Sequence, residues 1–115
     1  MTIKKTALHM VYEKAVDLGP PPPGNLAIPV FNHGSMEIEL YNPEETDPQT
    51  PHSRDEIYFV INGSGEFFNG QENVKVEKGS LLFVPAGIEH RFLNFSQDFA
   101  VWVIFYGPEG GEGNE

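Results

Sequence analysis

The stretch "GSLLFVPAGIEHRFLN", residues 79–94, predicts two short strands joined by a tight corner. Its apolar run ends at Val84, and Pro85 and Gly87 follow within three positions, where a fixed φ and a conformationally free residue favour a turn. His90 opens the second strand. It shares a face with Phe92 and Asn94, because side chains two positions apart in a strand point the same way. The corner is therefore followed by a histidine carried on a strand.

The same succession of short apolar runs and turn residues surrounds this stretch. The segments between the runs are rich in Gly, Asn, Pro and Ser, which supply the special backbone angles of tight turns. No helical stretch lies among them, so the pattern predicts an all-β sandwich or barrel with strands of about five to eight residues. The runs are "EIYFVI" (56–61), "GEFFN" (65–69), "NVKVE" (73–77), "SLLFVP" (80–85), "HRFLNF" (90–95) and "FAVWVIFY" (99–106).

One earlier strand is predicted from strict alternation. Met36, Ile38 and Leu40 fall on one face, and Glu37 and Glu39 fall on the other. Apolar and charged side chains at period two are typical of a half-buried strand. We therefore expect the glutamates to face away from the core.

Metal-ligating side chains are predicted in "PQTPHSRDEIYFVINGSGEF", residues 48–67. His52 and Glu56 have the same strand parity as Tyr58 and Val60, so all four can face a mostly apolar interior. A carboxylate buried there must be protonated, paired or bound to a cation. With His90, these residues form a set of two histidines and one carboxylate, which leaves coordination positions on a metal ion open.

Residues 79–94 resemble the second cupin motif, G(x)5PxG(x)2H(x)3N, at every fixed position. The first cupin motif, G(x)5HxH(x)3–4E(x)6G, is matched at His52, Glu56 and Gly63, whereas its first histidine falls on Thr50 and its leading glycine on Glu44. The resemblance covers about residues 36–106. It implies a small, single-domain cupin-type jelly-roll β-barrel that holds a divalent metal ion and commonly forms a dimer.

The threonine at the first histidine position leaves the ligand set open. A threonine hydroxyl is a poor ligand and shorter than an imidazole, so the ion is held either by His52, Glu56 and His90 with waters or by these three and a fourth group. The fourth candidates are Gln49, Thr50 itself and His33. The cofactor is expected to be one divalent ion (Fe, Mn, Zn or Ni). It retains about one positive charge beside two neutral imidazoles and one carboxylate, and so favours an anionic or enolate-like ligand.

Two further residues are weak candidates for catalysis. Arg54 lies between His52 and Glu56 with the same parity, so its guanidinium would either fork onto a substrate carboxylate or, as we favour, pair with a surface acid. Tyr58 is the candidate proton acceptor of an isomerase or lyase, because no third interior histidine is evident.

Three functions follow from this site. The first is a mononuclear metal dioxygenase acting on a small carboxylated or enolisable molecule. The second is a metal-assisted isomerase or lyase, and the third is a barrel that binds a small molecule without catalysis. The residues around a metal determine the reaction, so the motifs alone do not choose among the three.

The composition bears on partners and organisation. Seven Lys and Arg against seventeen Asp and Glu give a net charge of −10, which disfavours nucleic acid and anionic membranes. There is no cysteine, hence no thiolate ligand, and a cytoplasmic location is the default expectation. Strands apolar on both faces predict a homodimer. We divide the chain into an N-terminal arm or strand with a Pro-rich lead-in (1–35), the barrel (36–106) and a disordered tail (107–115).

Overall fold

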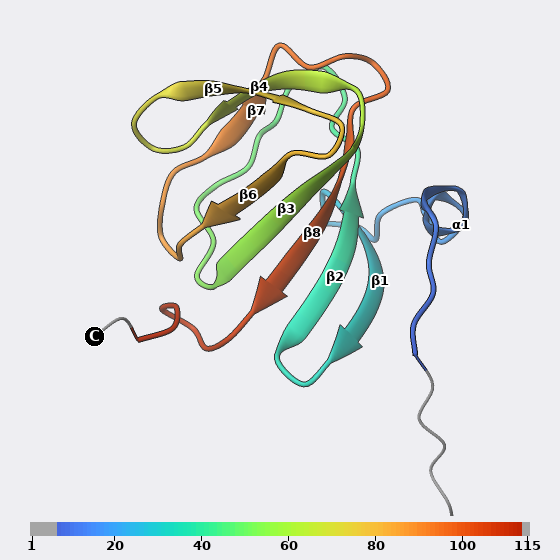
Figure 1. Ribbon diagram of the computed structural model, residues 1–115. Helices are drawn as coiled ribbons and strands as arrows, with labels where there is room; N and C mark the ends of the chain where they lie inside the picture. Colours follow the sequence, from blue (N-terminus) through green and yellow to red (C-terminus); the bar gives the residue numbers. More distant parts are fainter. Residues whose placement is uncertain (1–6, 114–115) are drawn as a thin grey trace, which may run out of the picture.

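The computed structural model describes residues 7–113, and Figure 1 shows two antiparallel sheets that face each other. The larger sheet has the strand order β1-β2-β8-β3-β6 and the smaller one β5-β4-β7. This is the expected all-β jelly roll. The elements are α1 (Tyr12–Val16), β1 (Ile28–His33), β2 (Met36–Tyr41), β3 (Asp55–Asn62), β4 (Ser64–Phe68), β5 (Asn73–Glu77), β6 (Leu81–Val84), β7 (Arg91–Leu93) and β8 (Ala100–Tyr106).

The strands form where apolar runs were predicted, since each run is bounded by turn residues. Gly63, between β3 and β4, shows why one such residue is needed. Its φ is 78°, and a Cβ there would lie 2.9 Å from the Cα of Phe99. A side chain at this position would be strained both by its backbone angle and by contact.

The core lies between the two sheets. On β3, Glu56, Tyr58 and Val60 point inward and are fully buried, as the parity of this strand predicts. They pack with aromatic and aliphatic side chains from β4, β7 and β8. His90 is buried next to this cluster, with its ring centroid 6.2 Å from that of Phe67. The interior is therefore apolar except for a few polar side chains at one end.

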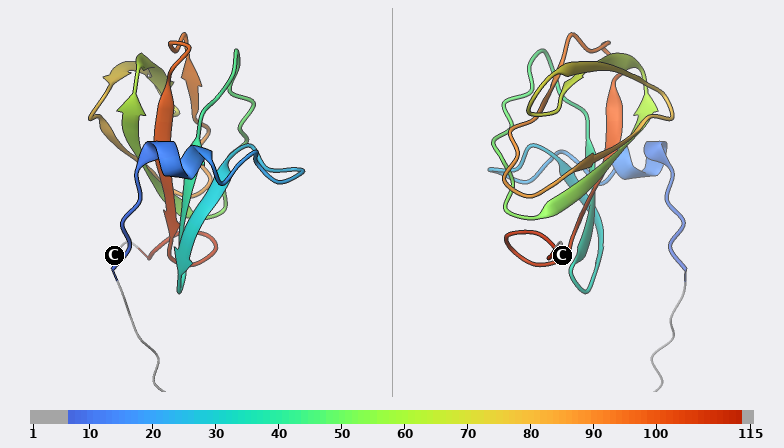
Figure 2. Two further views of the ribbon diagram at one scale, coloured as in Figure 1. Left: turned by 90° about the vertical axis from the view of Figure 1, so that its right-hand side faces the viewer. Right: turned by 60° about the vertical axis from the view of Figure 1, so that its left-hand side comes forward.

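Residues of the expected N-terminal arm take part in the barrel. β1 pairs with β2, and α1 lies across the outer face of both strands (Figure 2), where Ala15 packs against Leu40 and Ala100. The N-terminal boundary of the sheet is therefore Ile28 rather than residue 36.

This cover changes the orientation expected for β2. Leu40 is buried beneath α1 on the outer face, so its neighbours Glu39 and Tyr41 point to the inside of the barrel. The strand was predicted correctly, but the face that carries the glutamates was expected to point to solvent and instead points to the inside of the barrel. The alternation was misleading because both faces of β2 are partly covered.

The described part of the tail, residues 107–113, is held against the barrel. The backbone N–H of Gly110 donates to the carbonyl of Ser53 (2.6 Å), and that of Glu112 donates to Asp55 Oδ2 (2.9 Å). This differs from the disorder expected of a segment without apolar residues. Backbone hydrogen bonds replace the missing apolar contacts.

Asn94 also differs from expectation. It follows β7 with φ 51°, a left-handed conformation that asparagine tolerates, and its side chain is exposed rather than facing inward with Phe92. Over residues 7–113, α1 is the only helix, and it is far too short to cross a membrane.

Candidate metal centre

The corner after β6 places His90 in the barrel. Gly87 has φ 82°, and its N–H donates to the carbonyl of His52 (2.8 Å), so the corner is bonded to the loop that carries the other histidine. His90 Nδ1 then lies 2.8 Å from the carbonyl oxygen of Ile88. Because a carbonyl only accepts, Nδ1 carries the proton and Nε2 presents its lone pair to the interior.

Three metal-ligating side chains converge at this point. His90 Nε2 lies 2.9 Å from Glu56 Oε1, and His52 Nε2 lies 3.7 Å from the same oxygen. The donor atoms of all three residues lie within 4.8 Å of one another. Glu56 belongs to β3, His52 lies four residues before it in the preceding loop, and His90 lies just before β7, so two distant segments build one site.

The carboxylate of Glu56 fits a bound cation. Glu56 is completely buried, and neither of its oxygens accepts a hydrogen bond within residues 7–113. The short contact with His90 does not change this when Nδ1 holds the ring proton, since Nε2 then has none to donate. A buried anion without donors is costly, and an ion among Glu56, His52 and His90 would remove that cost.

The two imidazoles differ in electrostatic surroundings. Burial lowers the pKa of His52 and outweighs the opposing charge of Glu56. Burial also acts to lower the pKa of His90, but the adjacent Glu56 carboxylate, the Ile88 carbonyl and the charge of Asp47 raise it overall. His52 is therefore neutral at neutral pH. His90 must give up any proton on Nε2 when an ion binds.

A fourth donor points into the same space. Gln49 Oε1 lies 3.1 Å from His52 Nε2 and accepts a hydrogen bond from the hydroxyl of Tyr58 (2.8 Å). The Tyr58 hydroxyl is also 3.0 Å from His90 Nε2. Behind Gln49, its Nε2 donates to Asp47 Oδ2 (2.7 Å), which fixes the amide with its oxygen toward the histidines.

The family-model comparison agrees with this geometry. Residues 37–106 match the model described as "Cupin domain". The chain belongs to the cupin family.

Similar proteins extend over different shares of this cupin. An uncharacterised protein of Streptomyces coelicolor is 42% identical over 77 residues, which cover 65% of this chain and 73% of that protein. Acireductone dioxygenase 1 of Pectobacterium atrosepticum is 41% identical over 68 residues, 55% of this chain but 39% of its own length. The chain thus spans well under half of that dioxygenase. A cupin-2 domain protein of Shewanella frigidimarina shares the fold, with a TM-score of 0.67 at 15% identity over 85% of this chain and 94% of that one.

The other candidate ligands of this cupin lie apart from the triad. Thr50 is exposed at the rim of the adjacent cavity. His33 is exposed at the end of edge strand β1 and does not belong to the group of converging metal-type side chains found among the described residues. Of the three fourth-ligand candidates, only Gln49 directs a donor atom at the histidines.

Arg54 is bonded to groups other than those of the ion site. Its Nη1 donates to Glu37 (2.7 Å), its Nε donates to the carbonyl of Gly107 (3.0 Å), and its Nη2 donates to the carbonyl of Ser35. This is the pairing with a surface acid that the sequence analysis favoured. With these three partners, the guanidinium is not free to fork onto a ligand.

Tyr58 does not have the properties of a base. Burial and the charge of Glu56 raise its pKa well above 10, so the phenol stays protonated at neutral pH. Its single proton is directed to Gln49 or to His90. Tyr58 is therefore a hydrogen-bond donor inside the site, and proton abstraction requires another group.

A cavity of about 320 Å³ opens beside the site and contains a carboxylate that the sequence analysis assigned to solvent. Glu39 lines it, and burial raises the pKa of this carboxyl, with further increases from Glu37 and Glu56. The sequence offered one indication that Glu39 faces inward: it lies two positions before Tyr41 in the same strand and therefore shares its face. Besides Glu39, the cavity is lined by Gly24, Asn25, Leu26, Ala27, Tyr41, Pro48, Gln49, Thr50, His52, Val103 and Phe105.

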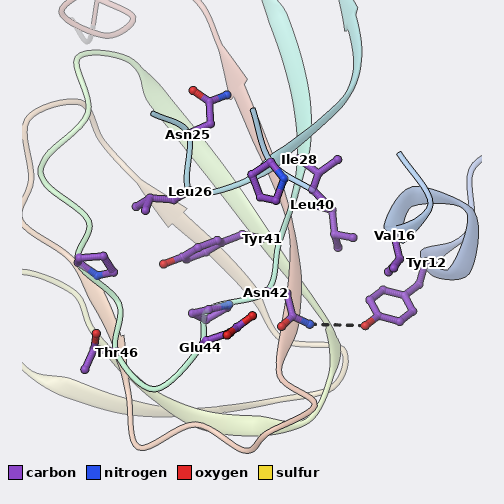
Figure 3. A pocket seen from close by; sticks show the side chains of 13 residues that line it. Tyr12, Val16, Asn25, Leu26, Ile28, Leu40, Tyr41, Asn42, Glu44 and Thr46 are labelled. Carbon is purple, nitrogen blue, oxygen red and sulfur yellow. Dashed lines mark hydrogen bonds between the residues drawn. The ribbon is translucent and has the colours of Figure 1, made fainter. Parts of the chain in front are cut away.

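A larger cavity, about 540 Å³, lies on the other side of Tyr41 and Leu26. Figure 3 shows these two side chains at one side of it and Tyr12 and Val16 of α1 at another, with a hydrogen bond from Asn42 to the Tyr12 hydroxyl (3.5 Å). None of the three triad residues lines this cavity. The chemistry of the protein is therefore expected in the smaller cavity.

Proposed function

We propose that this cupin binds one divalent metal ion through His52, Glu56 and His90, with the amide oxygen of Gln49 as the fourth donor. The observation that carries the proposal is the buried carboxylate of Glu56, which accepts no hydrogen bond from any of residues 7–113 and faces the Nε2 atoms of two histidines. When bound, the ion supplies positive charge and open coordination positions next to the cavity. Gln49 takes the role of the missing first motif histidine from one position earlier in the chain.

The reaction we propose is a dioxygenation of a small enolisable molecule. Two histidines and one carboxylate are a donor set of iron oxygenases, and the similarity to an acireductone dioxygenase supports this class. A carboxylate-bearing substrate is less well supported, because Arg54 is engaged outside the cavity. In this reaction the residues that line the cavity hold the substrate, and Tyr58 donates a hydrogen bond to the Gln49 amide oxygen and so keeps that donor in place.

A metal-assisted isomerase or lyase is the second candidate, and Glu39 favours it. Such a reaction needs a proton acceptor with a pKa raised toward neutrality, and burial raises the pKa of the Glu39 carboxyl in the same cavity. The two candidates differ in whether O₂ is consumed.

The proposal is tested by metal content and O₂ uptake. Protein purified without a chelating column should contain about one divalent ion per chain by elemental analysis, since three ligands are already within 4.8 Å. His90→Ala should lose that ion, whereas His33→Ala, which changes an exposed histidine away from the triad, should retain it. Protein loaded anaerobically with Fe(II) should consume O₂ with β-diketones in a panel that also contains catechols and thiols.

The outcomes separate the candidates. Turnover of an enolisable compound without O₂ uptake would favour the isomerase or lyase. A wild-type protein that takes up no divalent ion, even when Fe, Mn, Zn or Ni is supplied in excess, would refute the proposed function as a whole.

A further inference from the structure

The cavity beside the triad has an acidic inner wall. Glu39 of β2 lies opposite Val103 of β8, which in turn lies opposite Tyr58 of β3. All three side chains point to the inside of the barrel, so Glu39 is on the same concave surface as Tyr58 and Glu56, two strands away. His52 of the triad, Val103 and Glu39 all line the same cavity, so a molecule that fills it from His52 across Val103 reaches the Glu39 carboxylate.

No positive charge balances this wall within the described chain. Glu39 has no hydrogen bond or ion pair with any of residues 7–113, and none of the residues lining the cavity is Lys or Arg. Arg54, between His52 and Glu56 in the sequence, is bonded to Glu37 and two carbonyl groups, and Arg91, next to His90, pairs with Glu89. The other polar side chains of the cavity, Asn25, Gln49, Thr50 and the neutral His52, carry no charge at neutral pH.

We infer that Glu39 selects the ligand of this cavity, which is a small molecule that coordinates the ion at one end and carries a cationic or N–H donor group at the other. A carboxylate at that second end would face the Glu39 carboxylate in a confined space with few compensating dipoles, whereas an ammonium group would form a charge-assisted hydrogen bond with it. Glu39 therefore discriminates between ligands that share one metal-binding group but differ in the charge of their other end. This inference rests on the proposed metal site and adds the class of molecule that the site accepts.

The inference is tested with three hydroxamates that share one metal-binding group. Glycine hydroxamate ends in an ammonium group, propionohydroxamate in a methyl group, and malonate monohydroxamate in a carboxylate. Each is titrated into the Co(II)-loaded protein, and the visible absorption of the ion reports binding. We expect the wild-type protein to bind the ammonium compound at least about tenfold more tightly than the carboxylate compound, with the uncharged one between them.

Glu39→Gln should bring the three affinities to within about threefold of one another, because it removes the charge and keeps the shape. Glu77→Gln makes the same change at an exposed residue of β5, outside this cavity, and should leave the wild-type order intact. Equal binding of the three compounds by the wild-type protein, or an unchanged order in Glu39→Gln, would overturn the role of Glu39 while the metal site stands. A protein that does not bind Co(II) at all would instead refute the proposed function.

Discussion

Asp47 organises the candidate site, although it contacts none of the three triad residues through a hydrogen bond. It is buried and accepts hydrogen bonds from the Tyr41 hydroxyl (2.6 Å), the Phe92 N–H (2.8 Å) and the Gln49 side-chain amide (2.7 Å). The carboxylate thereby connects β2, β7 and the loop before β3. Asp47 also sets the direction of the Gln49 amide group. Because the amide nitrogen donates to Asp47, the amide oxygen turns toward His52.

At this scale we predict that Gln49→Ala weakens the binding of a divalent ion by about tenfold, because one donor is lost while His52, Glu56 and His90 remain. The affinity for Zn²⁺ is measured by competition with a chromophoric chelator. Gln97→Ala, at an exposed position away from the triad, serves as the control. An unchanged affinity in Gln49→Ala would mean that the amide oxygen only bonds to Tyr58 and His52.

Asp55, the first residue of β3, connects three segments around the site. Its Oδ1 accepts from the N–H of Ala86 in the corner after β6 (2.9 Å), and its Oδ2 accepts from the N–H of Glu112 in the tail (2.9 Å). These two backbone hydrogen bonds hold the pKa of Asp55 below its usual value of 3.8. The start of the strand that carries Glu56 is thus tied to the corner that precedes His90.

The pH dependence of stability tests this connection. A carboxyl with a lowered pKa in the folded protein stabilises it above about pH 4, and the contribution is lost as the pH falls through the folded-state pKa. Asp55→Asn should therefore lower the Tm at pH 7, and the difference from wild type should shrink as the pH falls from 4 to 2. Thermal unfolding followed by circular dichroism provides the measurement, with Asp17→Asn as a control that should change little. A difference that is constant across this pH range would contradict the assignment.

On the scale of the whole molecule, the outer face of the larger sheet is unusually apolar. Leu81, Phe83 and Phe59 are 69%, 56% and 41% exposed. Leu81 lies opposite Phe59 and Phe83 opposite Ile57, so the four side chains form one continuous patch. Within residues 7–113 no segment covers β6, an edge strand, as α1 covers β1 and β2. A patch of this kind in a chain of net charge −10 is typical of an interface.

We therefore propose that a second copy of the chain covers this patch, and we expect light scattering to give twice the monomer mass of 12.8 kDa. The double variant Leu81→Lys/Phe83→Glu should be monomeric at micromolar concentration, because it places charges in the middle of the patch. Val16→Lys alters a similarly exposed apolar residue on α1 and should remain dimeric. A monomeric wild-type protein would contradict the proposal.

The fold was predictable to the extent that it depends on local chemistry. Turn residues mark the strand ends, and the parity of β3 correctly places Glu56 and Tyr58 inside. Contacts between distant segments were not predictable. The orientation of Glu39 depends on α1 covering the other face of β2, the order in residues 107–113 depends on Asp55, and the direction of the Gln49 amide depends on Asp47. Each of these features depends on a contact with another segment of the chain or on the direction of a side chain in a loop, and local sequence patterns show neither.

The donors of the candidate centre differ in how firmly the backbone holds them. Glu56 lies on β3, which is paired on both sides, with β6 and with β8, whereas His52 and Gln49 belong to the loop that leads into β3. Ions of different radius can therefore be accommodated by small displacements of that loop, with the sheet acting as a fixed template. The affinities for different divalent ions should then differ less than in a centre whose ligands all lie on strands. Which ion is bound would then depend more on the concentration of each ion than on its radius.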